Sequence, residues 1–415
     1  MLFPIIRTFQ KRWYSSSSDI IAKAMVYSQY GKPSEVLSIH THPLPALTPS
    51  TLHLRFLASP INPADINQIE GVYPLKPPFS TEHIQSNVPV AIGGNEGVAM
   101  VVAVGDEVSG IKVGDWVVMA ESGFGACTLC FSVVEIEAFT TASKTSYFPF
   151  HPGTWRTHAV ATLADVQVIP NEGLDFLQAA TIAINPSTAY RMLKDFVNLQ
   201  EGDFVIQNGA NSSVGQYVIQ IANAWGIKTI NIVRKRQVNS LPRVLALSTG
   251  PLQYHLTAIG ATHVITDEEL GSLVNKKKVK EWTGGKPIML GLNCVGGKGA
   301  TEMAKYLSND AYYVTYGAMS RQPLTLPASL LIFKNIYFSG FWMSHWGKTH
   351  SRDARAEMLY DIATMMRNGR IRGARLERVE WDTRVDDAEA FRSLKTAIDK
   401  GISSFGNGKQ VLVMI

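Results

Sequence analysis

The stretch "VIQNGANSSVGQYVIQIA", residues Val205 to Ala222, determines the fold class of this chain. An apolar run leads into a turn of small polar residues and then into a segment whose apolar side chains have helical spacing. The following run, "KTINIVRKR", is again rich in β-branched residues. This succession predicts a strand, a helix and a second strand, a βαβ unit that indicates a parallel sheet.

The turn within this stretch has the composition of a phosphate-binding site. The first N–H groups of a helix have no partner within the helix, and small residues allow a pyrophosphate to approach them. A strict G-x-G-x-x-G motif is missing. A hydroxyl- and amide-rich turn with Asn211, Ser212, Ser213 and Val214 stands in its place. We predict that these four residues bind the pyrophosphate of a dinucleotide; the alternative is an ordinary tight turn between strand and helix.

The end of the second strand indicates which dinucleotide binds. Sites that select NAD place an Asp or Glu there to bind the ribose 2′-hydroxyl. This chain has Arg234, Lys235 and Arg236 instead. Such cations hold a 2′-phosphate through charge-assisted hydrogen bonds. The sequence therefore predicts NADPH as the cofactor, with a solvated basic strand end as the alternative.

Length and charge exclude several functional classes. The chain has 415 residues and a formal net charge of +5, and Arg7, Lys11 and Arg12 supply part of that charge. The remainder is close to neutral, which argues against nucleic-acid binding. No apolar run reaches the roughly 18 residues of a membrane span. Residues 1–21 are basic and serine-rich, which predicts a mitochondrial transit peptide, with a disordered tail as the alternative.

Further motifs complete a pattern that resembles a known family. They are "NPADINQIEGVYP", "GGNEGVAMVVAVGDEV", "GTWRTHA", "INPSTAYRML", "LNCVGGK", "YGAMSRQP" and "LLIFKNIYFSGFWMSHW". Together they resemble the mitochondrial 2-enoyl thioester reductases of the medium-chain dehydrogenase/reductase superfamily, over nearly all of residues 22–415. The resemblance implies reduction of trans-2-enoyl thioesters on CoA or acyl carrier protein, with NADPH, for fatty acid synthesis in the mitochondrial matrix.

The resemblance also implies an α/β architecture. A GroES-like, mostly β catalytic domain would cover residues 22–185, and a Rossmann doubly wound parallel-sheet domain would cover 186–345. Residues 346–415 would return to the catalytic domain. The family forms homodimers in which Rossmann sheets meet edge to edge. Two other functions stay open: an NADPH-dependent quinone or enone reductase of the same superfamily, and a non-catalytic NADPH-binding protein.

The family's functional residues carry over to matching positions. Its catalytic tyrosine corresponds to Tyr73 of "EGVYP", and a phenol can stabilise an enolate oxygen or help to protonate the α-carbon. Trp342 of "GFW" corresponds to a residue that lines the site. The implied cofactor contacts are Asn185, Asn211, Ser212, Ser213, Val214, Arg234, Lys235, Arg236, Tyr316, Gly317, Ala318, Met319, Phe341, Trp342, Met343, Ser344 and Lys409. Lys235 replaces an expected acidic residue, so Arg234 and Arg236 are the stronger candidates.

A catalytic metal is not expected. The zinc alcohol dehydrogenases of the superfamily need a Cys in an early segment and a His in "GHE". Here the first place is held by Asn62 to Asp65 and the second by Asn95. Neither supplies the thiolate or the imidazole that zinc requires.

Residues 126–153 interrupt the resemblance, because family members would join Gly125 directly to Thr154. The interruption contains Cys127, Cys130 and His151, fewer ligands than the four of a structural zinc site. Two interpretations remain: a loop specific to this protein, and translated intron. The codons of "SYFPFHP" are largely pyrimidine-rich, as expected before a splice acceptor, and sequenced cDNA distinguishes the two.

A second stretch, residues 237–263, raises the same suspicion more weakly. It is longer than in the family, and it contains Pro242 and Pro251. Proline interrupts a helix interior, so a helix packed on the sheet is not expected here.

Overall fold

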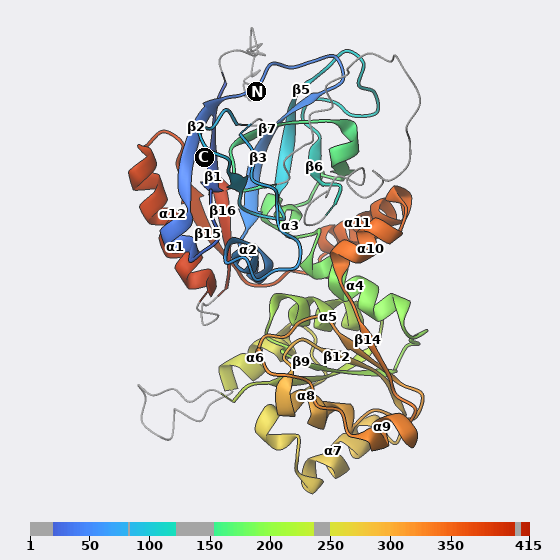
Figure 1. Ribbon diagram of the computed structural model, residues 1–415. Helices are drawn as coiled ribbons and strands as arrows, with labels where there is room; N and C mark the ends of the chain where they lie inside the picture. Colours follow the sequence, from blue (N-terminus) through green and yellow to red (C-terminus); the bar gives the residue numbers. More distant parts are fainter. Residues whose placement is uncertain (1–19, 82–83, 122–152, 236–249, 403–407) are drawn as a thin grey trace, which may run out of the picture.

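The computed structural model describes residues 20–81, 84–121, 153–235, 250–402 and 408–415. It consists of a mostly β part built on two sheets and a second part built on one parallel sheet, with α4, α10 and α11 near the junction (Figure 1). The predicted α/β class is confirmed. Residues 1–19 of the predicted transit peptide, Arg236 and nearly all of the 126–153 segment lie outside the described residues.

The second part is the predicted Rossmann sheet. Its strands are β9 (Phe204–Asn208), β10 (Lys228–Val233), β11 (His263–Thr266), β12 (Ile288–Asn293), β13 (Tyr312–Thr315) and β14 (Tyr337–Gly340). All pair in parallel, in the order β11-β10-β9-β12-β13-β14. This is the doubly wound order, whose switch point lies between β9 and β12, and ligands bind beyond the carboxyl ends of such strands.

The helices of this part are α4 (Asn185–Asp195), α5 (Ser213–Ala224), α6 (Gly250–Ala258), α7 (Leu273–Thr283), η4 (Asp267–Glu269), α8 (Gly297–Ala304) and α9 (Ala328–Ile332). The helix predicted within Val205 to Ala222 is confirmed as α5. The expectation against a packed helix in 237–263 was wrong for α6, where Leu256 is fully buried. Pro251 lies in the first turn of α6, where the missing N–H costs no hydrogen bond.

The mostly β part contains a seven-stranded and a three-stranded sheet. The larger comprises β3 (Leu52–Pro60), β5 (Val98–Val104), β6 (Trp116–Met119), β7 (His158–Ala161), β8 (Val166–Ile169), β15 (Leu376–Trp381) and β16 (Lys409–Met414), and the smaller comprises β1 (Ile21–Tyr27), β2 (Ser38–Pro43) and β4 (Ala91–Ile92). Strand β16 pairs antiparallel with β3, which brings Lys409 close to the end of β3. The C-terminal segment therefore contributes to the first part of the molecule.

Helices cover and connect these sheets. They are α1 (Pro33–Val36), α2 (Pro63–Ile69), η3 (Leu163–Asp165), α3 (Phe176–Ala180), α10 (Met343–Thr349), α11 (Arg352–Arg367) and α12 (Asp387–Ile402). Helix α2 begins directly after β3, and the Tyr73 loop follows α2. None of the described helices is both long enough and apolar enough to cross a lipid bilayer.

The fully buried Trp155 fits against a glycine pair between β4 and β5. A Cβ on Gly94 would lie 2.4 Å from the Trp155 ring, and Gly94 has a φ of +89°. We expect Gly94→Ala to lower the free energy of unfolding by roughly 2–4 kcal/mol, from left-handed backbone strain and overpacking together. Gly110→Ala is the control, because its φ is +82° but no atom lies within 4 Å of its Cβ position. Denaturant unfolding measures both; equal losses would contradict the packing argument.

Candidate active site

The predicted cofactor residues gather at one edge of the Rossmann sheet. Asn211 to Val214 follow β9, Arg234 and Lys235 follow β10, Tyr316 to Met319 follow β13, and Phe341 to Ser344 follow β14. Because parallel strands end at the same edge, these four segments line one side of the sheet across its switch point. A dinucleotide is expected to bind at this edge of the sheet.

The turn after β9 fits a pyrophosphate. Ser212 caps helix α5 by accepting a hydrogen bond from the Gly215 N–H at 3.1 Å. No described group accepts a hydrogen bond from the N–H of Ser213 or of Val214. A Cβ on Gly215 would lie 2.6 Å from the Gly209 carbonyl oxygen, so the turn is as tight as its residues permit. Free donors at the start of a helix suit an anion.

The two described basic residues after β10, Arg234 and Lys235, differ in whether they form an ion pair. Lys235 Nζ lies 2.7 Å from Glu268 Oε2, and the Lys235 N–H donates to Asp267 at 3.1 Å. The ion pair raises the pKa of Lys235. Arg234 is exposed and forms no ion pair with any residue in the described ranges. Arg234 is therefore the described side chain that is available to a 2′-phosphate.

Tyr73 and Trp342 meet across the two parts of the molecule. Trp342 Nε1 donates a hydrogen bond to the Tyr73 hydroxyl oxygen at 3.1 Å, and the rings pack edge to face. Tyr73 is half-buried, and burial raises the pKa of its phenol; the Trp342 bond opposes this and the charge of Asp65 adds to it. The phenol is therefore protonated at neutral pH and can donate a hydrogen bond.

Asn185 and Lys409 converge on the side chain of Asn62. Asn185 is the first residue of α4, and its Nδ2 donates to Asn62 Oδ1 at 3.4 Å. Lys409 Nζ donates to the same oxygen. Two residues 224 positions apart, both predicted to contact the cofactor, are thus fixed by a third residue for which no role had been predicted.

Two buried carboxylates lie behind these groups. Glu96 accepts hydrogen bonds from Asn62 Nδ2 at 2.9 Å and from the Ile184 N–H at 2.7 Å. Asp65 accepts from the Asn62 N–H at 2.6 Å and from Asn95 Nδ2 at 2.5 Å. Each is only 1% exposed. The segment Asn62 to Asp65 and the segment with Asn95 and Glu96 correspond to those that the zinc enzymes use for their metal. In this chain, hydrogen bonds connect the two segments.

Burial dominates the ionisation of these acids. It raises the pKa of Asp65 to about 7, and the donors on Asn62 and Asn95 and the charge of Lys409 only partly oppose it. It likewise raises the pKa of Glu96 and lowers that of Lys409. Within the described ranges, no group of three or more His, Cys, Asp or Glu side chains is arranged to hold a metal ion.

Sequence reasoning did not assign Asn62, Asp65, Gln68 and Glu96 to the site. The only available signal was an acidic residue within the otherwise apolar and small "IGGNEGVAM", because a charged side chain in such surroundings is rare unless it has partners. The contacts that bring these residues together depend on three segments that meet only in the folded chain.

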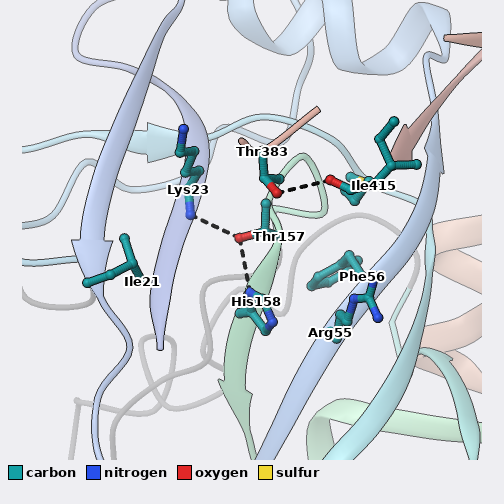
Figure 2. Close-up of a pocket in the computed structure, with 9 residues that line it drawn as sticks. Ile21, Lys23, Arg55, Phe56, Thr157, His158, Thr383 and Ile415 are labelled. Atoms are coloured by element: carbon teal, nitrogen blue, oxygen red, sulfur yellow. Dashed lines mark hydrogen bonds between the residues drawn. The ribbon is translucent and has the colours of Figure 1, made fainter. Parts of the chain in front are cut away.

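A separate hollow lies in the mostly β part. Figure 2 shows its lining side chains, among them Lys23, Arg55 and His158, and its volume is about 160 Å³. None of its lining residues is a predicted site residue. It is smaller than the roughly 300–1,000 Å³ of typical ligand pockets, so it is not the cleft for a thioester.

Comparisons with known families place the chain in a class. The alcohol dehydrogenase GroES-like domain matches residues 48–171, and the zinc-binding dehydrogenase family matches residues 213–359. The chain thus combines a GroES-like domain with a Rossmann domain, as medium-chain dehydrogenases/reductases do.

Relatives define the family within this class. The mitochondrial enoyl-[acyl-carrier-protein] reductase of Schizosaccharomyces pombe is 38% identical over 408 residues, which is 97% of each chain. The human enzyme of the same name is 38% identical over 97% of this chain and 91% of its own. The chain belongs to the mitochondrial enoyl-[acyl-carrier-protein] reductase family.

Solved structures agree. The mitochondrial 2-enoyl thioester reductase Etr1p/Etr2p heterodimer from Candida tropicalis matches with a TM-score of 0.80 and 34% identity, over 95% of this chain and 100% of that chain. The complex of Etr1p with NADP and crotonyl-CoA matches with a TM-score of 0.80 and 33% identity over the same shares.

We expect Arg234→Ala to weaken NADPH binding by roughly 10- to 100-fold, because hydrogen bonds to charged groups contribute about 1.5–3 kcal/mol. NADH lacks the 2′-phosphate, so its affinity should not change. Lys235→Ala is the control, and its effect should be smaller because Lys235 is paired with Glu268. Fluorescence titration with both cofactors measures this. An equal loss for NADPH and NADH would contradict the assignment.

Proposed function

We propose that this chain is an NADPH-dependent reductase of trans-2-enoyl thioesters, carried on CoA or acyl carrier protein, and that it acts in mitochondrial fatty acid synthesis. One observation carries the proposal: in a chain of this family, the Tyr73 hydroxyl lies at the junction of the two domains in contact with Trp342. The mitochondrial relatives and the basic N-terminus support the location.

Bound NADPH supplies a hydride to the β-carbon of the enoyl group. Negative charge then develops on the thioester oxygen, and a hydrogen-bond donor at that oxygen lowers the barrier. Tyr73 suits this role, because its oxygen already accepts a hydrogen bond from Trp342 and its own O–H is left to point to the substrate. The raised pKa of Tyr73 keeps the proton on the phenol, where it stabilises the enolate oxygen or assists protonation of the α-carbon.

The proposed cofactor-binding residues contact different parts of NADPH. The free N–H groups of Ser213 and Val214 serve the pyrophosphate, Arg234 serves the 2′-phosphate, and Lys409 and Asn185 serve the end nearest Tyr73. We also propose that Tyr316 to Met319 after β13 and Phe341 to Ser344 after β14 contact the cofactor.

We further propose a homodimer in which β14 pairs with β14 of a second copy. Strand β14 is the last strand of the Rossmann sheet order, so one of its edges is unpaired among the described strands. Helix α9, which precedes β14 in the chain, ends in an exposed apolar group formed by Leu331, Ile332 and Phe333, of which Phe333 is 77% exposed. An unpaired edge and an exposed apolar patch are the usual ingredients of a strand-pairing interface.

The functional test compares the wild-type chain with Tyr73→Phe. The wild-type chain is expected to oxidise NADPH with a short trans-2-enoyl-CoA. Tyr73→Phe should lower kcat by roughly 10²- to 10⁴-fold, the range for loss of a positioned proton donor, with NADPH affinity preserved. Absorbance at the NADPH band measures this. Turnover of a quinone without turnover of the thioester would contradict the proposal.

The oligomer test uses Phe333→Glu. A charge in the centre of an apolar interface is costly, so we expect this variant to elute as a monomer where the wild-type chain elutes as a dimer. Val113→Glu, on an exposed loop residue of the GroES-like domain, should remain dimeric. Light scattering after size exclusion gives the mass. A wild-type monomer, or a dimeric Phe333→Glu, would contradict the interface.

A further inference from the structure

The buried carboxylates of Asp65 and Glu96 impose a direction on the amides around them. An ionised carboxylate only accepts hydrogen bonds, whereas an amide side chain donates from nitrogen and accepts at oxygen. Neither carboxylate has an ion-pair partner within the described ranges. Every amide in contact with one must therefore present its nitrogen to it and its oxygen elsewhere.

Glu96 controls one such chain of contacts. Asn62 presents Nδ2 to Glu96, so its Oδ1 faces the opposite way and accepts from Lys409 and Asn185. The Glu96 carboxylate thereby holds the two donors that serve the cofactor.

Asp65 sets the direction of a second series of hydrogen bonds. Asn95 Nδ2 donates to Asp65 Oδ1 at 2.5 Å and to Gln68 Oε1 at 2.7 Å. Gln68 accepts with its oxygen, so its Nε2 is left to donate to the Leu75 carbonyl at 3.2 Å. Leu75 lies two residues after Tyr73, on the same loop. This series of hydrogen bonds therefore connects a buried carboxylate to the loop that carries the phenol of Tyr73.

The oxygen of Asn95 supports this direction. Asn95 Oδ1 is buried and has no hydrogen-bond partner, so the amide leaves its acceptor unused while its nitrogen donates twice. Such an orphaned group is costly. The arrangement persists because both neighbours of Asn95 require a donor.

We propose that Asp65 is a positioning residue for Tyr73: its carboxylate fixes the direction of the Asn95–Gln68 amide chain, and that chain holds the Tyr73 loop in its reactive position. This inference rests on the proposed reductase activity. Asp65 touches neither substrate nor cofactor; it acts through Gln68.

Loss of the negative charge on Asp65 reverses the direction of the hydrogen bonds that run through Asn95 to Gln68. A protonated carboxyl, or an amide in its place, presents a donor to Asn95, whose unused oxygen can turn to accept it. Gln68 Oε1 then faces an oxygen. If Gln68 turns as well, its contact with the Leu75 carbonyl is lost. Either way one link to the Tyr73 loop fails, so the active form of the enzyme is the one in which Asp65 is ionised.

Several groups set the ionisation of Asp65. Burial raises its pKa to about 7; among neighbouring charges, Lys409 lowers it and Glu96 raises it. The charge of Asp65 in turn raises the pKa of Tyr73 and of Tyr27. We therefore expect kcat/KM of the wild-type chain to increase as the pH is raised through about 7.

The stability effect has the opposite sign. The folded pKa of Asp65 lies above its ordinary value of 3.8, so between pH 4 and about 7 the folded chain keeps a proton that the unfolded chain has released. Folded protein binds more protons in that window, so stability falls as the pH rises. Ionised Asp65 thus supports activity at the expense of stability.

The experiment compares Asp65→Asn with the wild-type chain. We expect kcat with trans-2-enoyl-CoA to fall roughly 10- to 100-fold, as for a misplaced catalytic group. The increase in kcat/KM near pH 7 should disappear, while NADPH affinity stays within about twofold. The Tm of Asp65→Asn minus that of the wild-type chain should become more positive from pH 5 to pH 8. A purely structural role would leave kcat and the pH profile of kcat/KM of Asp65→Asn at the wild-type values, because the change in Tm with pH follows from the raised pKa alone.

Two further variants make the outcome decisive. Gln68→Met keeps the side-chain length but removes both polar contacts, so it should lose kcat as Asp65→Asn does while keeping the wild-type dependence of Tm on pH. Asp165→Asn is the matched control: Asp165 is partly buried, accepts from the Thr162 N–H at 2.7 Å as Asp65 accepts from the Asn62 N–H, and has a raised pKa, but it lies in η3 away from Tyr73. Its kcat should match the wild-type value.

Wild-type kcat in Gln68→Met, or an unchanged pH profile in Asp65→Asn, would overturn the proposal. If Asp65→Asn does not fold, Gln68→Met and the wild-type pH profile decide. If the wild-type chain reduces a quinone and no thioester, the proposed function fails. The same variants, assayed with the quinone, then still test whether Asp65 positions Tyr73.

Discussion

Burying Asp65 and Glu96 without an ion pair constrains the whole active site. An unpaired buried charge is expensive, and only a full set of donors makes it tolerable. The chain supplies those donors from the amides of Asn62 and Asn95 and from the backbone at Ile184. These donors come from the loop before α2, the segment after β4 and the residue before α4, so satisfying the two acids fixes three segments relative to one another.

The same constraint connects the two domains. Asn62 joins Glu96 of the GroES-like domain to Asn185 at the start of α4 and to Lys409 on the returning strand β16. The Tyr73 loop follows α2, and Trp342 follows the last Rossmann strand. The phenol and the cofactor edge of the sheet are thus held together by hydrogen bonds between segments that are remote in sequence. In this chain, hydrogen bonds join the two segments that the zinc enzymes of the superfamily use for their metal.

The sequence was sufficient for the features that depend on local pattern. The run from Val205 to Ala222 predicted β9 and α5, and Arg234 was predicted from its place after β10. Pro251 was misread because its effect depends on where the helix begins. Gln68 and Glu96 could not be assigned to the site, because an amide's direction depends on a carboxylate that only the fold brings near. The role of Tyr73 came from the family resemblance, since a loop tyrosine alone indicates little.

The proposed reaction delivers a hydride from NADPH to the β-carbon of the thioester and a solvent-derived proton to the α-carbon. Reduction of trans-2-butenoyl-CoA with unlabelled NADPH in D₂O, followed by NMR of the product, tests this directly. We expect butanoyl-CoA with one deuterium at the α-carbon and none at the β-carbon. Deuterium at the β-carbon, or no saturated thioester from a chain that still binds NADPH, would contradict it.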